Sequence, residues 1–351
     1  MLPTYSGVAP NQPRQHGSTN APVVTRLHRP LLVTSAAMAA LVLFSLVAMP
    51  FDDRTLLGES VWLKPMKFGL AFFLYGLTLA WLLSLPHKGS RATWWLGTVF
   101  AVTGSVDVGF IVVQAARGTF SHFNTEGDPV NSIGQLVFAS GVPGLFFANL
   151  VIVVILSWQR LVDRPTARAV HAGLALAVVG MALGYLMGFT GKQLVRDSEG
   201  RVVELAAGHT VAPDTGDLAP RDAMGGMPIT HWSTVGGDLR VPHFVGLHGI
   251  QVLLLVSFAL ARLAPRYRWL RSERARAAVV GVLAAGYSGL LALVFWQAMR
   301  AQPLVHPDSV TAAAAAGLAA TVAALLAAVY RLHRGGLPPA ESISADVPRR
   351  G

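Results

Sequence analysis

Ionisable side chains within long apolar stretches are the residues of this sequence best placed to do chemistry. Asp107 lies in such a stretch, and an acid at membrane depth costs ~2.5 to 3.5 kcal/mol on insertion scales. We expect its side chain to face other helices, either as a proton acceptor or ligand-binding group, or as a structural acid bonded to a neighbouring helix. Gln114, seven residues later, shares its helical face.

Histidines occur at the start of a later apolar stretch. His243 and His248 are five residues apart, and Gln251 follows His248 by three. Imidazole suits metal ligation and proton transfer near neutral pH. Five residues correspond to about 140° around a helix, so this pair is not expected to chelate one ion as residues four apart would. His248 is expected to be either a ligand or proton-transfer group, or a hydrogen-bonded packing residue.

Basic residues gather near the same predicted membrane boundary. Lys64 and Lys67 are expected either to extend toward lipid headgroups or to hold an anionic ligand. Polar residues predicted on this side define a candidate ligand-binding cavity, made of Asp107, Lys67, Gln114, Arg117, His122, Arg240, His243, His248 and Gln251. Further polar residues on that side are Asn124, Gln297, Arg300 and His306.

The chain has no cysteine, which excludes disulfides, thiolate nucleophiles and thiolate-bound metals. A metal would need His, Asp or Glu ligands, and the candidates are His248, His243, His122 and Asp107. Three functions stay open: a protein that binds or transports a small polar or lipid-like ligand, a metal-dependent enzyme acting on a lipid, and a haem protein with two axial histidines. The sequence identifies neither the cofactor nor the oligomeric state, and it does not say whether the protein is an enzyme.

Composition defines the elements that must position these residues. Of the 351 residues, 53% are hydrophobic and only 13% are charged, too little polar surface for a water-soluble particle of this size. We predict an all-α, polytopic transmembrane bundle of about eight spans. Apolar runs long enough to cross a bilayer occur near 30–50, 66–86, 93–115, 135–158, 168–190, 243–264, 277–299 and 309–331.

The net charge of +10 indicates how the chain is oriented in the membrane. The link between the sixth and seventh runs contains Arg262, Arg266, Arg268, Arg271, Arg274 and Arg276. Cytoplasmic links are enriched in Lys and Arg, so this link and both termini are predicted in the cytoplasm. The expected partner is therefore a lipid bilayer, with no nucleic acid.

The domain organisation follows from the runs. Residues 1–25 and 335–351 are predicted to be disordered cytoplasmic tails, and residues 26–334 a transmembrane helical domain. Within it, residues 191–242 form a long extracytoplasmic loop, either an ordered lid or a flexible excursion. Gly141 and Pro143 interrupt the fourth run, which predicts a kink or a local break in that helix.

Three strings carry a resemblance: WLKPxKF at 62–68, QxxRGxxSHFN at 114–124 and GDLRxxHFxGLH at 237–248. With them the chain resembles a group of uncharacterised bacterial polytopic inner-membrane proteins over most of its length. The resemblance implies a bacterial inner-membrane protein and carries no activity with it.

Overall fold

The computed structural model describes residues 27–157, 159, 162–212 and 218–335. Among them, eight helices are each long and apolar enough to cross a membrane. The prediction of an all-α polytopic bundle is confirmed, and the protein is a multi-pass integral membrane protein. The predicted tail 1–25 and residues 336–351 of the predicted tail 335–351 lie outside the described residues, so their disorder stays a prediction.

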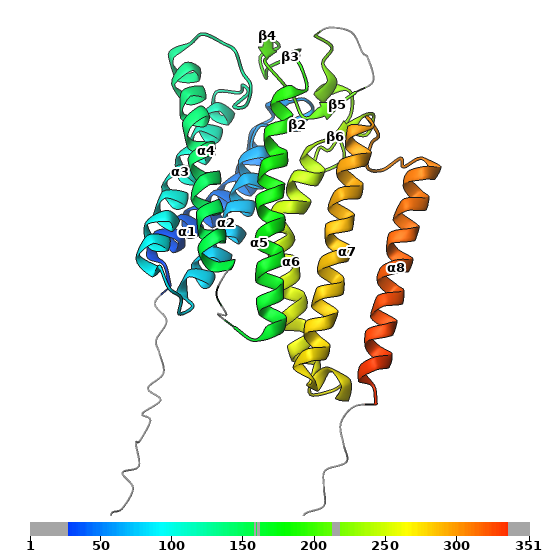
Figure 1. Ribbon diagram of the computed structural model, residues 1–351. Helices are drawn as coiled ribbons and strands as arrows, with labels where there is room; N and C mark the ends of the chain where they lie inside the picture. Colours follow the sequence, from blue (N-terminus) through cyan, green and yellow to red (C-terminus); the bar gives the residue numbers. More distant parts are fainter. Residues whose placement is uncertain (1–26, 158, 160–161, 213–217, 336–351) are drawn as a thin grey trace, which may run out of the picture.

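The helices follow one another along the chain (Figure 1). Their bounds are α1 Arg29–Ala48, α2 Leu63–Ser84, α3 Ser90–Ala116, α4 Pro129–Ser157, α5 Arg164–Tyr185, α6 Arg240–Leu263, α7 Glu273–Met299 and α8 Ser309–His333. Short 3₁₀ helices span Met49–Phe51, Leu186–Phe189, Arg221–Ala223 and Arg268–Arg271. Each helix matches one predicted run, but α4 begins at Pro129 rather than at residue 135. The reason is that its first turns contain Asn131 and Gln135, which lower the local hydropathy and bond to the preceding link.

Six short strands gather at one end of the bundle, here called the loop end, where α1, α3, α5 and α7 finish (Figure 1). They pair as three antiparallel two-stranded sheets. Their bounds are β1 Thr55–Leu56 with β2 Glu59–Ser60, β3 Gln193–Arg196 with β4 Val202–Leu205, and β5 Thr210–Val211 with β6 Gly237–Asp238. The arginine-rich link between α6 and α7 lies at the opposite end of the bundle.

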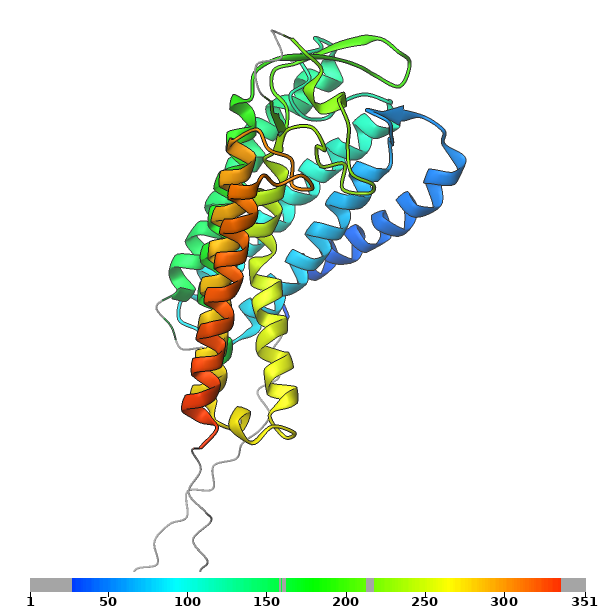
Figure 2. The same ribbon diagram turned by 90° about the vertical axis from the view of Figure 1, so that its right-hand side faces the viewer.

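The helices pack as two groups of four. One group is α1 to α4 and the other is α5 to α8, joined where α4 meets α5 and where α2 meets α6. Figure 2 shows α1, α2 and α3 inclined to the helices of the second group. The loop end of the α2–α6 junction therefore lies between the two groups.

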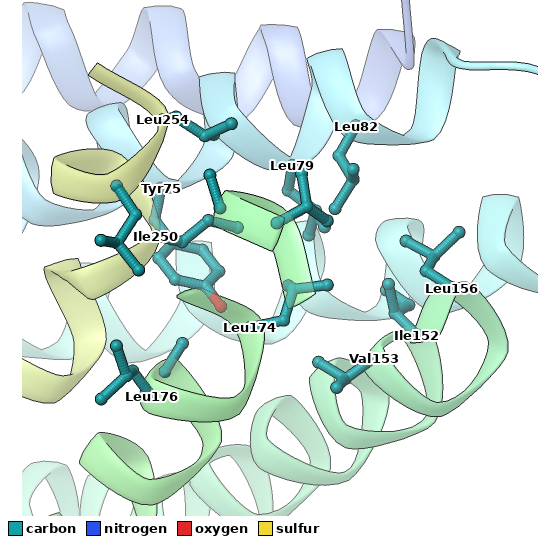
Figure 3. Close-up of a cluster of buried hydrophobic side chains, with 14 of the residues drawn as sticks. Tyr75, Leu79, Leu82, Ile152, Val153, Leu156, Leu174, Leu176, Ile250 and Leu254 are labelled. Atoms are coloured by element: carbon teal, nitrogen blue, oxygen red, sulfur yellow. The ribbon is translucent and has the colours of Figure 1, made fainter. Parts of the chain in front are cut away.

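An apolar core joins the groups (Figure 3). Leu79 of α2, Ile152 of α4, Leu174 of α5 and Ile250 of α6 are each at most 2% exposed. Burial of a Leu or Ile side chain stabilises by ~1.5 to 3 kcal/mol relative to exposure. In the second group, α5 and α6 approach closely because Gly180 leaves room. A Cβ there would lie 2.4 Å from the backbone nitrogen of Leu247.

The long loop is folded where the structure describes it. Strands β3 and β4 pack Val195, Val203 and Leu205 against Phe120 of the α3–α4 link. Backbone hydrogen bonds also join Leu194 to Leu218 (3.1 Å). Residues 191–212 and 218–239 fold over the loop end.

Candidate functional site

Two lysines at the start of α2 differ in their partners. The Nζ of Lys67 donates to Glu59 Oε2 of β2 at 3.1 Å and to the carbonyl of Thr230 at 3.3 Å. Lys64 is only partly exposed, yet within the described part of the chain it makes neither a hydrogen bond nor an ion pair. The charges of Lys67 and Arg240 repel its ammonium group, while those of Asp222 and Glu59 attract it. Lys64 is thus an amino group without a dedicated counterion among the described residues.

Arg240, in the first turn of α6, is held by Asp238 at the end of β6. Its Nη2 donates to Asp238 Oδ2 at 2.6 Å and its Nε to Oδ1 at 3.0 Å, a two-point pairing that fixes the guanidinium plane. The same carboxylate accepts the backbone N–H of Ser233 at 2.7 Å. A second Nη2 bond reaches the carbonyl of His231. Arg240 therefore brings α6 and the long loop together.

His209 and Asp222 form a second buried pair. His209 Nδ1 lies 2.9 Å from Asp222 Oδ2, and Gln193 Nε2 donates to the same oxygen at 3.0 Å. Burial favours the neutral acid, but the charge and hydrogen bond of His209 outweigh it and hold the pKa of Asp222 far below its usual range. An ionised Asp222 accepts the Nδ1 hydrogen of His209, which leaves Nε2 as the ring atom open to other contacts.

His243 of α6 has one ring nitrogen engaged in the same way. Its Nδ1 lies 2.7 Å from the carbonyl oxygen of Gly180 on α5. A carbonyl can only accept, so we assign the hydrogen to Nδ1, and Nε2 of the neutral ring keeps its lone pair. His243 thus resembles His209: each ring is held at Nδ1 and has Nε2 open.

His122, in the link between α3 and α4, lies within electrostatic range of Lys64, His209 and His243. Its ring packs against Phe138 at 4.5 Å and Phe68 at 5.6 Å between centroids. Burial holds the pKa of His122 well below its usual value, and repulsion from Lys64 lowers it further. His122 is therefore neutral at physiological pH and within electrostatic range of these groups.

His231 of the long loop is neutral for a similar reason. Burial lowers its pKa, and the charges of Arg240 and Lys67 lower it further against the opposing effect of Glu59. Its Nε2 is buried without a hydrogen-bond partner. A buried polar atom without a partner is uncommon, so this nitrogen has an unused hydrogen-bonding capacity next to the cluster.

Together these side chains form what we call the loop-end cluster. Its basic members are Lys64, Lys67, His122, His209, His231, Arg240 and His243, and its acids are Glu59, Asp222 and Asp238. The cluster lies at the α2–α6 junction under the ordered loop. Four of the nine predicted site residues belong to it, namely Lys67, His122, Arg240 and His243.

Other predicted site residues position the cluster from outside. Gln114 is fully buried and donates to Asn131 Oδ1 at 2.9 Å, while Arg117 pairs with Asp128 at 2.8 Å. Both contacts fix the α3–α4 link that carries His122. The structure therefore assigns Gln114 and Arg117 to the folding of this link.

Further along α6, the ring of His248 stacks on Phe244, and Gln251 Nε2 donates to Thr78 Oγ1 of α2 at 3.2 Å. Gln251 therefore joins the two helix groups one level below the cluster. The remaining polar residues predicted on this side bond locally, as Asn124 does within its own link, Gln297 to the carbonyl of Pro303 and Arg300 to Asp308.

Asp107 lies apart from the loop-end cluster. Its side chain faces Gly141 of α4, and its charge is not among those that act on His122. The four metal candidates His248, His243, His122 and Asp107 therefore do not converge. Among the residues that the structure describes, no group of three or more His, Cys, Asp or Glu side chains is arranged to hold a metal ion.

Sequence reasoning missed five members of the cluster. Asp238 had a usable signal, since it lies two residues before Arg240. Glu59, His209, Asp222 and His231 lie in loops without a periodic pattern, and only the folded loop brings them to α2 and α6.

Comparison of the chain with family models, with curated proteins and with solved structures finds no match in any of the three. The resemblance to bacterial inner-membrane proteins stays a prediction. The function has to be argued from the side chains at the loop end.

Proposed function

We propose that this protein binds a small anionic ligand, either a free anion or the anionic headgroup of a lipid, at the loop-end cluster. The observation that carries the proposal is Lys64. It is partly buried beside Lys67 and Arg240, whose charges repel it, while the cluster's acids already have partners: Glu59 holds Lys67, Asp238 holds Arg240 and Asp222 holds His209.

A bound anion would supply the missing counterion. A cation withdrawn from water is costly unless it is paired. Lys64 presents three donors, and neutral His122 can donate to an oxygen of the same ligand from a ring nitrogen. The ordered loop, held by Arg240 and Asp238, limits access of water and strengthens each contact.

The side of the membrane follows from charge. With the arginine-rich α6–α7 link in the cytoplasm, the loop end faces outward. The ligand would then arrive from the extracytoplasmic side or from the outer leaflet. Placement in a bacterial inner membrane belongs to the same proposal and is supported by the resemblance described above.

The test is ligand-dependent thermal unfolding of the purified protein in detergent. Inorganic phosphate, sulfate and citrate probe free anions, and nanodiscs with or without phosphatidylglycerol probe a headgroup. A ligand that binds the native state raises the unfolding temperature in proportion to occupancy. We expect Lys64→Met to weaken the effective anion by at least tenfold, while Lys88→Met, which removes an exposed lysine at the opposite end, leaves it unchanged. Equal responses of wild type and both variants, or no response to any anion or anionic lipid, would contradict the proposal.

A second candidate function rests on the open Nε2 atoms of His209 and His243. Histidines that ligate metals usually donate Nδ1–H to a carboxylate or a backbone carbonyl, as Asp222 and Gly180 accept here. A transition metal or haem iron could bind at one of these nitrogens. Metal content by mass spectrometry and the visible spectrum, measured on one sample of wild type and of His243→Ala, test this. Stoichiometric metal or haem that is lost in the variant would favour it over anion binding.

A further inference from the structure

Asp107 is an acid deep in the first helix group with no role in the loop-end cluster. It precedes the end of α3 at Ala116 by nine residues, which places it ~13 Å below the loop end. Its side chain is 4% exposed, and its Oδ1 is buried without a hydrogen-bond partner.

In the ranges that the structure describes, no element packed against α3 offers Asp107 a counterion. α3 packs against α4, α2 and α1. The described helix α4 contains no ionisable side chain at all, and the one in α1 is Arg29 at the far end of the bundle. In α2, Lys64 and Lys67 lie at the loop end, and the Tyr75 hydroxyl donates to Asn149. An isolated carboxylate in such surroundings is strongly disfavoured, whereas the neutral acid is tolerated.

The packing of α4 is built around this carboxyl group. A Cβ on Gly141 would lie 2.5 Å from Asp107 Oδ1, so glycine leaves the space that the acid occupies. Pro143, two residues later, removes one backbone hydrogen bond from α4 and makes the helix easier to bend at this level.

An aromatic pair separates Asp107 from the polar cluster. One turn nearer the loop end, Phe110 of α3 and Phe138 of α4 meet edge to face at 5.1 Å between centroids. Phe138 also packs against the His122 ring, with the ring centroids 4.5 Å apart. The α3–α4 contact that encloses Asp107 thus continues directly to the cluster.

We propose that Asp107 is an intramembrane proton-binding site, which holds its proton while α3 and α4 are packed as in this structure and releases it when they separate. Ionisation requires water or a cation to reach the carboxylate, and the Phe110–Phe138 pair blocks that route from the loop end. Movement of α4 away from α3 would open it and would shift Phe138 against His122. The proposal does not depend on the identity of the loop-end ligand.

Infrared spectroscopy of the full-length protein in lipid at neutral pH tests this assignment. We expect a carboxylic-acid C=O stretching band that is absent from Asp107→Asn and retained in Asp308→Asn, which alters an exposed acid paired with Arg300. Asn has the size of Asp and mimics its neutral form, so the variant should fold. If wild type and Asp107→Asn show the same acid bands, Asp107 is ionised and the proposal is wrong.

A second measurement needs no variant. Solid-state NMR of wild-type protein labelled with ¹³C-aspartate should show one carboxyl resonance in the protonated range at pH 7, with all others ionised. Slow loss of the acid proton in D₂O, relative to exposed groups, would show that the packed helices retain it. The absence of any protonated aspartate would overturn the proposal independently of the infrared result.

Discussion

The molecule contains two buried polar sites, and they accommodate ionisable side chains away from water in different ways. In the loop-end cluster, between the two helix groups, the acids Glu59, Asp222 and Asp238 each hold a basic partner. Asp107, inside the first group, has none. A paired ion keeps its charge at all physiological pH values, whereas an unpaired acid in apolar surroundings is stable only when neutral. The paired Lys67 and Arg240 are therefore fixed charges of the cluster, whereas Asp107 is suited to hold or release a proton.

The largest expected effect comes from breaking a pair in the cluster. Asp238→Ala leaves the guanidinium of Arg240, 16% exposed, without its carboxylate, and removing one partner of a buried pair costs ~3 to 5 kcal/mol. We expect a large fall in the unfolding temperature in detergent. The double variant Asp238→Ala/Arg240→Met should recover much of the loss, because no uncompensated charge remains. A single variant as stable as wild type would show that the pair is not buried in the membrane-embedded protein.

At the Asp107 site, we expect an added methyl group, rather than a removed charge, to lower the stability of the fold. Gly141→Ala places a methyl group against the Asp107 carboxyl, and overpacking typically costs ~1 to 3 kcal/mol. Gly109→Ala on α3 is the matched control, since a Cβ there meets no atom within 4 Å. Thermal unfolding should separate the two variants. If Gly141→Ala is as stable as Gly109→Ala, the carboxyl group does not fill this space.

The two sites also differ in how far the sequence predicted them. Asp107 lies in a regular helix, so its position along an apolar run placed it at membrane depth, and the cost of exposing an acid to lipid placed it facing other helices. The structure confirms its burial, and the partner on a neighbouring helix that its structural alternative required is not found in the described residues. The eight spans were predicted from the same kind of apolar run, which extends over many turns of each helix.

The loop-end cluster was only half predictable. Lys67 and Arg240 lie at helix starts, where position along a span fixes the level in the membrane. His209 and Asp222 come together because β3, β4 and the Arg221–Ala223 turn fold over the bundle. Such contacts depend on tertiary packing of short strands, for which the sequence contains no periodic signal. Gln114 and Arg117, also predicted at the cavity, make their contacts at the α3–α4 link, outside the cluster.

The histidines of the cluster should make the protein sensitive to mild acid. The pKa values of His122 and His231 are lowered in the folded state, so below about pH 6.5 the unfolded chain binds protons that the folded one excludes. Stability should therefore fall as pH decreases from 7 to 5, by at most about 1.4 kcal/mol per pH unit for each group.

A ligand that binds the cluster should oppose this loss. An anion beside His122 raises its pKa, so by linkage the anion binds more tightly as pH falls. Unfolding temperatures measured from pH 7 to 5 give the slope of stability against pH, once without ligand and once with phosphate or citrate. His122→Phe should flatten the slope without ligand. A slope of the opposite sign would mean that these histidines are charged in the folded protein.

The smallest effect is expected for an ion pair outside both sites. Lys192 pairs with Glu204 at 2.8 Å, but the lysine side chain is 63% exposed, and exposed pairs contribute ~0 to 1 kcal/mol. Lys192→Met should hardly change the unfolding temperature, whereas Lys67→Met leaves the partly buried Glu59 without its cation and should lower it clearly. The two variants remove the same amino group from ion pairs of similar length. The difference between their unfolding temperatures therefore reports the effect of burial. Equal effects would mean that the loop-end cluster is open to water. Lys64 would then be hydrated and would not require a bound anion.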